Sequence, residues 1–340
     1  MSAIVVEQVT KQFPREVRPA VAGVSFAAEE GSIVVLLGPS GCGKTTLLKM
    51  INRLYEPDSG RILVGGVDAR ELPATDLRRR IGYVIQQVGL FPHMRIEQNI
   101  AVVPRLLGWH QPRIDARIDE LLDLVGLPRA YRKRYPRQLS GGEQQRIGLA
   151  RALAADPAIM LMDEPFGAID AITRARLQDE LLGIQRQLRK TILFVTHDVE
   201  EALRLADKII VMRMGEIVQF DTPLQIITQP RDAFVRDLVG ADDVLRALSL
   251  VRVATVLDAQ ARQMVKRAEP SDAPTFAGDG AGEVATISPD DDLRSALSRL
   301  LASDAESLAV VDGDGRLLGR LALADIRAVA AQQQPSAQEA

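Results

Sequence analysis

The sequence lacks several features that would place a protein outside the cytoplasm or in a membrane. Its 340 residues include one cysteine, Cys42, which excludes an internal disulfide and a zinc site built from several cysteines. No apolar run approaches the ~20 residues that a membrane-spanning helix needs. The amino terminus has no basic stretch followed by an apolar one, so we expect no signal peptide.

Neither sign of charge dominates the chain. Lys and Arg total 42 and Asp and Glu total 45, which gives a formal net charge of −3. This balance argues against a basic nucleic-acid-binding protein, so we expect no nucleic-acid partner. With 46% apolar and 26% charged residues, the chain can bury hydrophobic cores. At ~150 residues per domain, its length predicts about two domains.

Residues 1–240 show the pattern of an α/β domain. Short apolar runs alternate with amphipathic stretches of helical periodicity, which is typical of buried parallel strands joined by crossover helices. The clearest apolar runs are residues 33–37, 159–162, 191–195 and 209–212. After Gly240 we expect a connector over residues 241–282, helical up to residue 268 and then rich in Pro, Gly, Asp and Ala.

A second, smaller α/β domain is predicted over residues 283–331. Its predicted elements are a strand over 284–287, a helix opened by Ser288 and Pro289, apolar strands over 307–311 and 317–323, and a helix over 325–331. The sequence Asp-Gly-Asp-Gly at residues 312–315 is a strong hairpin signal between the two apolar strands. Residues 332–340 are expected to be a disordered tail.

Residues 38–45 fit the phosphate-binding pattern GxxxxGK[ST], between an apolar strand and a helix. The glycines let successive backbone N–H groups point at phosphates where the helix dipole favours anions. We expect Lys44 to reach the β and γ phosphates and the Thr45 hydroxyl to ligate Mg²⁺. The expected nucleotide-binding residues of this loop are Gly38, Pro39, Ser40, Gly41, Cys42, Gly43, Lys44, Thr45 and Thr46.

A buried strand over residues 159–162 leads directly into two adjacent carboxylates, Asp163 and Glu164. Because side chains alternate along a strand, the two carboxylates point in different directions. One can therefore serve a metal ion and the other an attacking water molecule.

The segment Leu139-Ser140-Gly141-Gly142-Glu143-Gln144-Gln145-Arg146 resembles the signature sequence of ATP-binding-cassette (ABC) ATPases. It lies between the phosphate loop and the acidic strand, as in that family, and it has Glu143 where Gln is frequent. The resemblance implies a P-loop ABC-ATPase nucleotide-binding domain, with a RecA-like core and a helical subdomain, over residues 1–240.

Further family landmarks occur in the expected order. Gln86 matches a loop glutamine that reaches the metal and couples to the membrane subunit, and Phe13 lies where the family places an aromatic ring against adenine. Residues 167–170 match the loop that follows the acidic strand. His197 matches a histidine that touches the γ-phosphate.

The resemblance implies a head-to-tail homodimer that sandwiches two ATP molecules and Mg²⁺. The expected catalytic residues are Glu164, His197, Lys44 and Gln86, and the expected metal-site residues are Thr45, Gln86 and Asp163. Across the dimer, the other subunit contributes Ser140, Gly141, Gly142 and Glu143 to each nucleotide. Cys42 lies within the phosphate loop, so we expect a maleimide to inactivate the protein and ATP to prevent this.

One cassette without a long heptad array favours a transporter subunit over a DNA-repair or translation ATPase. The separate cassette resembles bacterial importers, which implies permease subunits in the membrane, an extracytoplasmic binding protein and a peripheral position on the cytoplasmic membrane face. Residues 87–107 would form the dock for the permease. Residues 163–181 resemble the importers of quaternary amines (glycine betaine, choline, carnitine). An importer of another small solute, such as an amino acid, and a soluble ABC ATPase are the alternatives.

The second domain resembles one cystathionine-β-synthase (CBS) repeat, an appendage of that importer family; an ACT-like fold is the alternative. Such repeats work in pairs, so residues 241–268 are either a degenerate first copy or a helical connector. The domain would sense an ion or a nucleotide, or would serve dimerisation. Ala322 stands where many nucleotide-binding repeats have Ser or Thr before the Asp, here Asp325, which weakens a nucleotide assignment.

Overall fold

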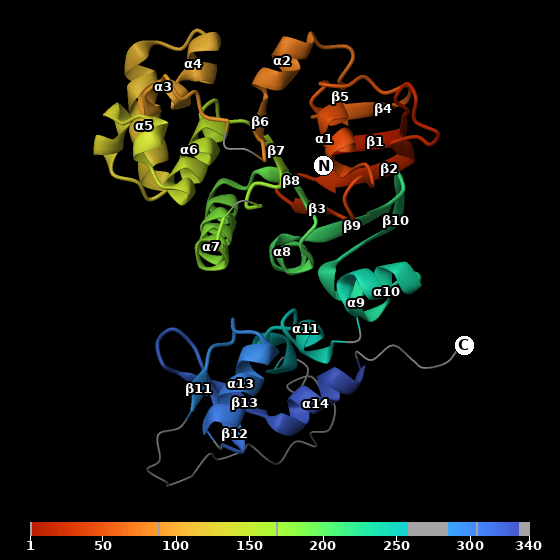
Figure 1. Cartoon of the computed structure of the whole chain (residues 1–340). Helices are drawn as coiled ribbons and strands as arrows, with labels where there is room; N and C mark the ends of the chain where they lie inside the picture. Colours follow the sequence, from red (N-terminus) through yellow and green to blue (C-terminus); the bar gives the residue numbers. More distant parts are fainter. Residues whose placement is uncertain are drawn as a thin grey trace. The chain divides into compact units, whose positions relative to one another are not determined.

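The computed structural model describes residues 2–86, 89–167, 169–241, 243–257, 285–303 and 305–332. The predicted linker over 269–282 and the predicted tail beyond residue 332 lie outside the described residues. The chain forms two compact units, Met1–Thr222 and Pro223–Ala340 (Figure 1). Residues 223–240, which the sequence analysis placed in the first domain, therefore belong with the second.

A six-stranded sheet forms the centre of the first unit. Its strand order is β10 (Glu216–Asp221), β9 (Lys208–Arg213), β3 (Ile33–Leu37), β8 (Thr191–Thr196), β7 (Ile159–Asp163) and β6 (Ile81–Val84). All pairs are parallel except β10 with β9. Every residue of β3, β7 and β8 is buried, as the continuous apolar runs predict for strands covered on both faces.

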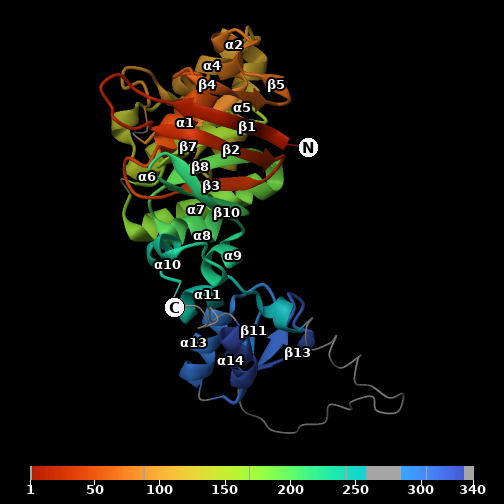
Figure 2. The same cartoon turned by 90° about the vertical axis from the view of Figure 1, so that its right-hand side faces the viewer.

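A second, antiparallel sheet was not predicted from the sequence. Its order is β2 (Val21–Glu29), β1 (Ser2–Lys11), β4 (Ser59–Val64) and β5 (Val67–Asp68). Figure 2 shows β1 and β2 from their side of the unit. Their burial alternates only in part, because register shifts interrupt the pairing of β1 with both neighbours.

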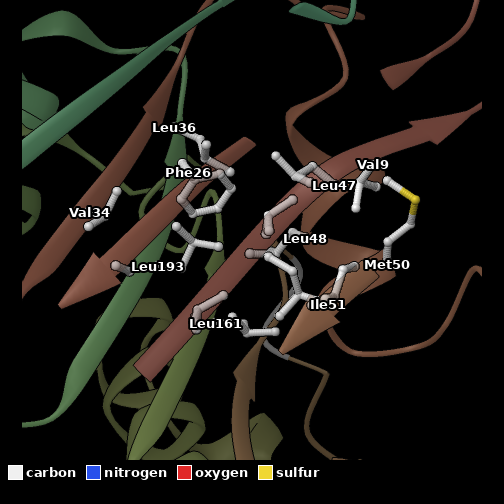
Figure 3. Packing of buried hydrophobic residues seen from close by; sticks show 14 of the residues in the cluster. Val9, Phe26, Val34, Leu36, Leu47, Leu48, Met50, Ile51, Leu161 and Leu193 are labelled. Atoms are coloured by element: carbon white, nitrogen blue, oxygen red, sulfur yellow. The ribbon is translucent and has the colours of Figure 1, made fainter. Parts of the chain in front are cut away.

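Helix α1 (Lys44–Ile51) joins the two sheets into one core. Leu47, Leu48, Met50 and Ile51 are completely buried among residues of both sheets, including Val9 and Phe26 of the antiparallel sheet and Leu36, Leu161 and Leu193 of the six-stranded sheet (Figure 3). Burying a side chain of this size contributes roughly 1.5–3 kcal/mol. This packing fixes the start of α1, and therefore the phosphate loop, against the sheet.

One group of helices in the first unit lies beside the sheet (Figure 1). Its members lie between β6 and β7 in the sequence: α3 (Ile96–Ile100), α4 (Val102–Leu106), α5 (Gln111–Leu124), η1 (Arg129–Lys133), η2 (Pro136–Gln138) and α6 (Gly141–Leu153). The others are α2 (Ala74–Arg79), α7 (Ala171–Leu188) and α8 (Val199–Leu205). In α5 the buried residues are Ile114, Ile118, Leu121 and Leu122, the spacing of one helical face.

The second unit contains a three-stranded sheet in the order β11 (Thr286–Ile287), β12 (Ser307–Val311), β13 (Leu317–Ala322). Its helices are α9 (Pro223–Thr228), α10 (Ala233–Val239), α11 (Val244–Leu248), α13 (Leu293–Ser303) and α14 (Leu323–Gln332). The predicted hairpin at residues 312–315 is confirmed, because β12 and β13 pair antiparallel. Helix α14 begins two residues earlier than the sequence predicts and includes Gln332, which the sequence predicts to lie in the tail.

The predicted helix start at Ser288 is wrong. The Ser288 N–H donates to the Asp291 carboxylate over 3.2 Å, which closes a turn instead of a helix. The next residue, Asp292, pairs with Arg252 in an isolated bridge and accepts from the Ser295 N–H at 2.7 Å, so it caps α13. The helix therefore begins after its cap residue Asp292 and not at Ser288 and Pro289.

Within the described residues, the connector is part of the core of the second unit. After α11, residues 253–257 form a further helical turn. Leu248, Val251, Val253 and Val256 are buried in one cluster with Ile287, Leu293, Leu308 and Leu321. The small sheet thus obtains part of its apolar cover from residues that precede the predicted domain.

Candidate functional site

The parallel register brings four sequence motifs to one edge of the sheet. Leu37 of β3 pairs with Thr196 of β8, and Asp163 of β7 pairs with Val195. The phosphate loop, the acidic pair and the segment containing His197 therefore all leave the sheet at the same level. Val84 of β6 pairs with Met162, which brings Gln86 to this edge as well. Ligands of open α/β sheets bind outside such carboxyl ends.

The phosphate loop holds a conformation that depends on glycine. Gly43 precedes α1 with φ of 107°, and a Cβ at this position would lie 2.2 Å from the Ala20 carbonyl oxygen. A Cβ at Gly41, in contrast, would meet nothing within 4 Å. The loop is thus packed tightly against residue 20 and open on its other side, as a cradle for an anion requires.

Lys44 and Thr45 begin helix α1 and point into the site. The Lys44 ammonium is buried and donates to the carbonyl oxygens of Gly38 and Pro39 at 2.6 and 3.0 Å. The Thr45 hydroxyl donates to the Asp163 carboxylate at 2.9 Å. Burial raises the pKa of Asp163, and the bond from Thr45 opposes that effect only in part.

Glu164 lies between two other predicted catalytic residues. The Gln86 amide nitrogen donates to Glu164 Oε2 at 3.0 Å, and His197 Nδ1 lies 3.2 Å from Glu164 Oε1. The Glu164 backbone has φ of 44°, and its N–H donates to the Val195 carbonyl oxygen at 3.0 Å. This arrangement directs the carboxylate toward the phosphate loop instead of back along the strand.

A cavity of about 580 Å³ covers the phosphate loop. The predicted residues that line it are Phe13, Ser40, Gly41, Gly43, Lys44, Thr45, Thr46 and Glu164. The Phe13 ring packs edge-on against Tyr55, with ring centroids 5.2 Å apart. A cavity lined by an aromatic side chain and by a glycine-rich loop fits a purine nucleotide with its phosphates.

Cys42 does not face this cavity. Its side chain is 3% exposed and belongs to the hydrophobic core between the two sheets. The accessible thiol that the maleimide expectation requires is therefore absent, although the Cys42 backbone remains part of the loop.

The signature residues lie apart from the phosphate loop of the same chain. They line a separate cavity of about 450 Å³ together with Ile169, Asp170 and Thr173 from the segment that begins α7. Ser140 caps α6: its hydroxyl accepts from the Glu143 N–H at 3.3 Å, and its own N–H donates to the Glu143 carboxylate at 2.7 Å. This reciprocal pair is a capping box.

Comparison with known proteins gives a consistent result over almost the whole chain. Residues 21–167 match the ABC transporter family model and residues 281–331 match the CBS domain model. The chain is 47% identical to the osmoprotectant import ATP-binding protein OsmV of Salmonella typhimurium, covering 93% of this chain and 78% of that protein. The chain belongs to the ABC transporter ATP-binding family.

Other similar proteins extend the same relationship. The glycine betaine uptake system ATP-binding protein YehX of Escherichia coli is 49% identical, over 90% of this chain and 94% of that protein. The solved dimeric structure of a bacterial ABC transporter cassette is similar with a TM-score of 0.58 and 33% identity, over 65% of this chain and 98% of that one. The expected fold, an ABC ATPase cassette followed by a CBS domain, is confirmed. No helix among the described residues of this ABC ATPase is both long and apolar enough to cross a bilayer.

One feature of this ABC ATPase bears on the residue roles expected from the family. The Glu143 carboxylate accepts from the Ser140 N–H, which lowers its pKa, and also from the Tyr131 hydroxyl at 2.9 Å. Its negative charge therefore serves the helix cap. The nucleotide cavity is also lined by residues outside the predicted motifs: Glu16, Arg18, Pro19, Ala20, Met214 and Gly215. They carry no motif, because they come from a loop and a turn of ordinary composition.

Proposed function

We propose that this chain is the ATP-hydrolysing subunit of a binding-protein-dependent importer of quaternary-amine osmoprotectants. The main support is identity of 45–49% over at least 90% of the chain with three proteins whose names include osmoprotectant, glycine betaine, carnitine or choline transport. The matched length includes residues beyond the cassette, so the relationship is more specific than membership of the ABC family. An importer of another small solute is the alternative, because no solute site is identified among the residues that the structure describes.

Glu164 is positioned to accept a proton from the attacking water. Its two carboxylate oxygens are held by Gln86 and His197, so the side chain is oriented before substrate binds. A preoriented base, together with the loop N–H groups and Lys44, lowers the barrier by positioning and by stabilising negative charge on the transferred phosphoryl group. We assign His197 to hold Glu164 and to approach the γ-phosphate.

Mg²⁺ fits the donor set at the start of α1. Thr45 Oγ1 and Asp163 Oδ1 lie 2.9 Å apart, and both are hard oxygen donors of the kind that Mg²⁺ prefers. Gln86 would complete this side of the metal shell. Bound Mg²⁺ would neutralise charge on the β and γ phosphates. Asp163 must be deprotonated to take part.

The separation of the two cavities supports a head-to-tail homodimer. Ser140, Gly141 and Gly142 line a cavity that includes no phosphate-loop residue of their own chain, so a second copy would bring them to the nucleotide. We further assign integral permease subunits and an extracytoplasmic binding protein as partners, and the cytoplasmic membrane face as the location. The segment expected to contact the permease begins at residue 87, of which residues 89–107 are described.

For the second unit we propose a regulatory role, with dimerisation as the alternative. Its match to the CBS family supports either role. The ligand class stays open between an ion and a nucleotide. Ala322 N–H donates to the Asp325 carboxylate at 2.8 Å, so this Asp is engaged in capping α14.

Uptake of labelled glycine betaine, choline and carnitine tests the proposed function. A strain that lacks the gene is complemented with the wild type or with Lys44→Ala, and uptake is measured at low and high salt. We expect uptake of at least one of the three solutes with the wild type, none with Lys44→Ala, and an increase with salt.

The outcomes separate the alternatives. Wild-type uptake of none of the three solutes at either salt concentration would refute the osmoprotectant assignment while leaving the ABC ATPase intact. Uptake of an amino acid instead would favour the alternative substrate class. Purification without any multi-span membrane protein, together with absence of uptake, would favour a soluble ABC ATPase.

A further inference from the structure

The loop between β1 and β2 forms one wall of the nucleotide cavity and is anchored at both ends. At its start, the Gln12 N–H and the Lys11 ammonium donate to Asp58 at 2.7 and 2.8 Å. At its end, the Ala20 carbonyl oxygen lies against Gly43, and the Ala22 N–H donates to the Gly215 carbonyl oxygen at 2.9 Å. The wall is therefore held against both the phosphate loop and the turn between β9 and β10.

Arg18 is a cation on this wall that no motif assigns. Its Nη1 lies 3.3 Å from the sulfur of Met214, and both residues line the cavity. Among the described residues, no carboxylate lies within salt-bridge distance of the Arg18 guanidinium. A thioether is only a weak acceptor, so it leaves the positive charge of Arg18 uncompensated.

The charges that line the cavity show why this cation matters. The charged lining residues are Glu16, Arg18, Lys44 and Glu164, so their formal charges cancel. The Lys44 ammonium already contacts two carbonyl oxygens of its own loop. A nucleotide polyphosphate would bring several negative charges, and without Arg18 the lining itself would be negative.

The lining of the cavity indicates which part of the nucleotide Arg18 meets. Arg18 lines the same cavity as the phosphate loop. In the sequence it lies two residues before Ala20, whose carbonyl oxygen lies against Gly43 of that loop. The phosphates carry the negative charge of a nucleotide, so they are the groups that attract this cation.

We propose that Arg18 is a nucleotide-binding residue whose guanidinium contacts the phosphate groups, with Met214 supporting it. The contact is a charge-assisted hydrogen bond from a flexible, solvent-exposed side chain. Such a bond is stronger than a neutral one but is screened by water and salt. This proposal rests on ATP as the ligand of the cavity, and not on the transported solute.

Equilibrium binding of ATP, ADP and adenosine to the full chain tests the proposal. The variants are Arg18→Ala and Arg18→Lys, with Arg15→Ala as the matched control. Arg15 is an exposed arginine of the same loop that does not line the cavity. We expect Arg18→Ala to raise the Kd of ATP and of ADP by about threefold to tenfold. The Kd of adenosine should change less than twofold, because adenosine has no phosphate.

Arg18→Lys should recover part of the affinity, and Arg15→Ala should bind ATP as the wild type does. The ATP and ADP losses should shrink as salt is raised, because screening weakens the contact. Equal ATP affinity for Arg18→Ala and the wild type would overturn the proposal. An equal loss for adenosine would also overturn it, because the loop rather than a phosphate contact would then be affected. Failure of the wild type to bind ATP would instead refute the ATPase function itself.

Discussion

Replacement of Glu164 by Gln separates proton transfer from nucleotide binding. The substituted side chain has almost the same shape, and its amide can keep both neighbours of the carboxylate. Its oxygen can accept from Gln86 Nε2, now 3.0 Å from Glu164 Oε2, and its NH₂ group can face His197 Nδ1, now 3.2 Å from Oε1. We therefore expect Glu164→Gln to bind ATP with near wild-type affinity.

The same variant cannot accept a proton from water. A positioned general base contributes roughly 10²–10⁴ in rate, which corresponds to about 3–5 kcal/mol of barrier. Steady-state phosphate release should fall by that factor, while the melting temperature stays close to that of the wild type. The assay compares phosphate release and ATP binding for wild type, Glu164→Gln and Lys44→Ala. Near wild-type turnover by Glu164→Gln would refute the assignment of the base, and a loss of ATP binding would refute the argument from shape.

Three further outcomes follow from packing and burial. Gly43→Ala should weaken ATP binding at least tenfold, since its Cβ would lie 2.2 Å from a carbonyl oxygen. Gly183→Ala, within α7 and with nothing near the added Cβ, should leave binding unchanged, and equal affinities of the two variants would contradict this. Maleimide should modify the buried Cys42 slowly in the folded protein and rapidly in urea; rapid modification without urea would show an open loop. Burial raises the pKa of Glu201 above its ordinary 4.5. The free energy of unfolding should therefore fall as the pH rises from 4.5 through the raised pKa of the folded protein. At neutral pH Glu201→Gln should raise the melting temperature and flatten this pH dependence; a lower melting temperature would contradict the sign.

The sequence alone determined the short motifs of this protein. The phosphate loop needs glycines, Lys44 and Thr45 within eight residues, and a buried apolar strand leading into Asp163 and Glu164 is equally local. Such short motifs can be read from the sequence because their backbone conformation depends mainly on neighbouring residues. The β12–β13 hairpin was predicted for the same reason, from the turn residues at 312–315.

Only the tertiary structure decided which of these motifs lie in contact. Gln86 and Glu164 are 78 positions apart, and the register of parallel strands places their side chains 3.0 Å from each other. Packing also turned the Cys42 thiol into the core and placed Arg18 and Met214 on the nucleotide cavity, although neither belongs to a motif. The first unit ends at Thr222 and not at the predicted residue 240, because the core of the second unit includes apolar residues of the helices that precede its sheet. These outcomes depend on contacts between residues distant in sequence, and a local pattern carries no information about which distant partner it will meet.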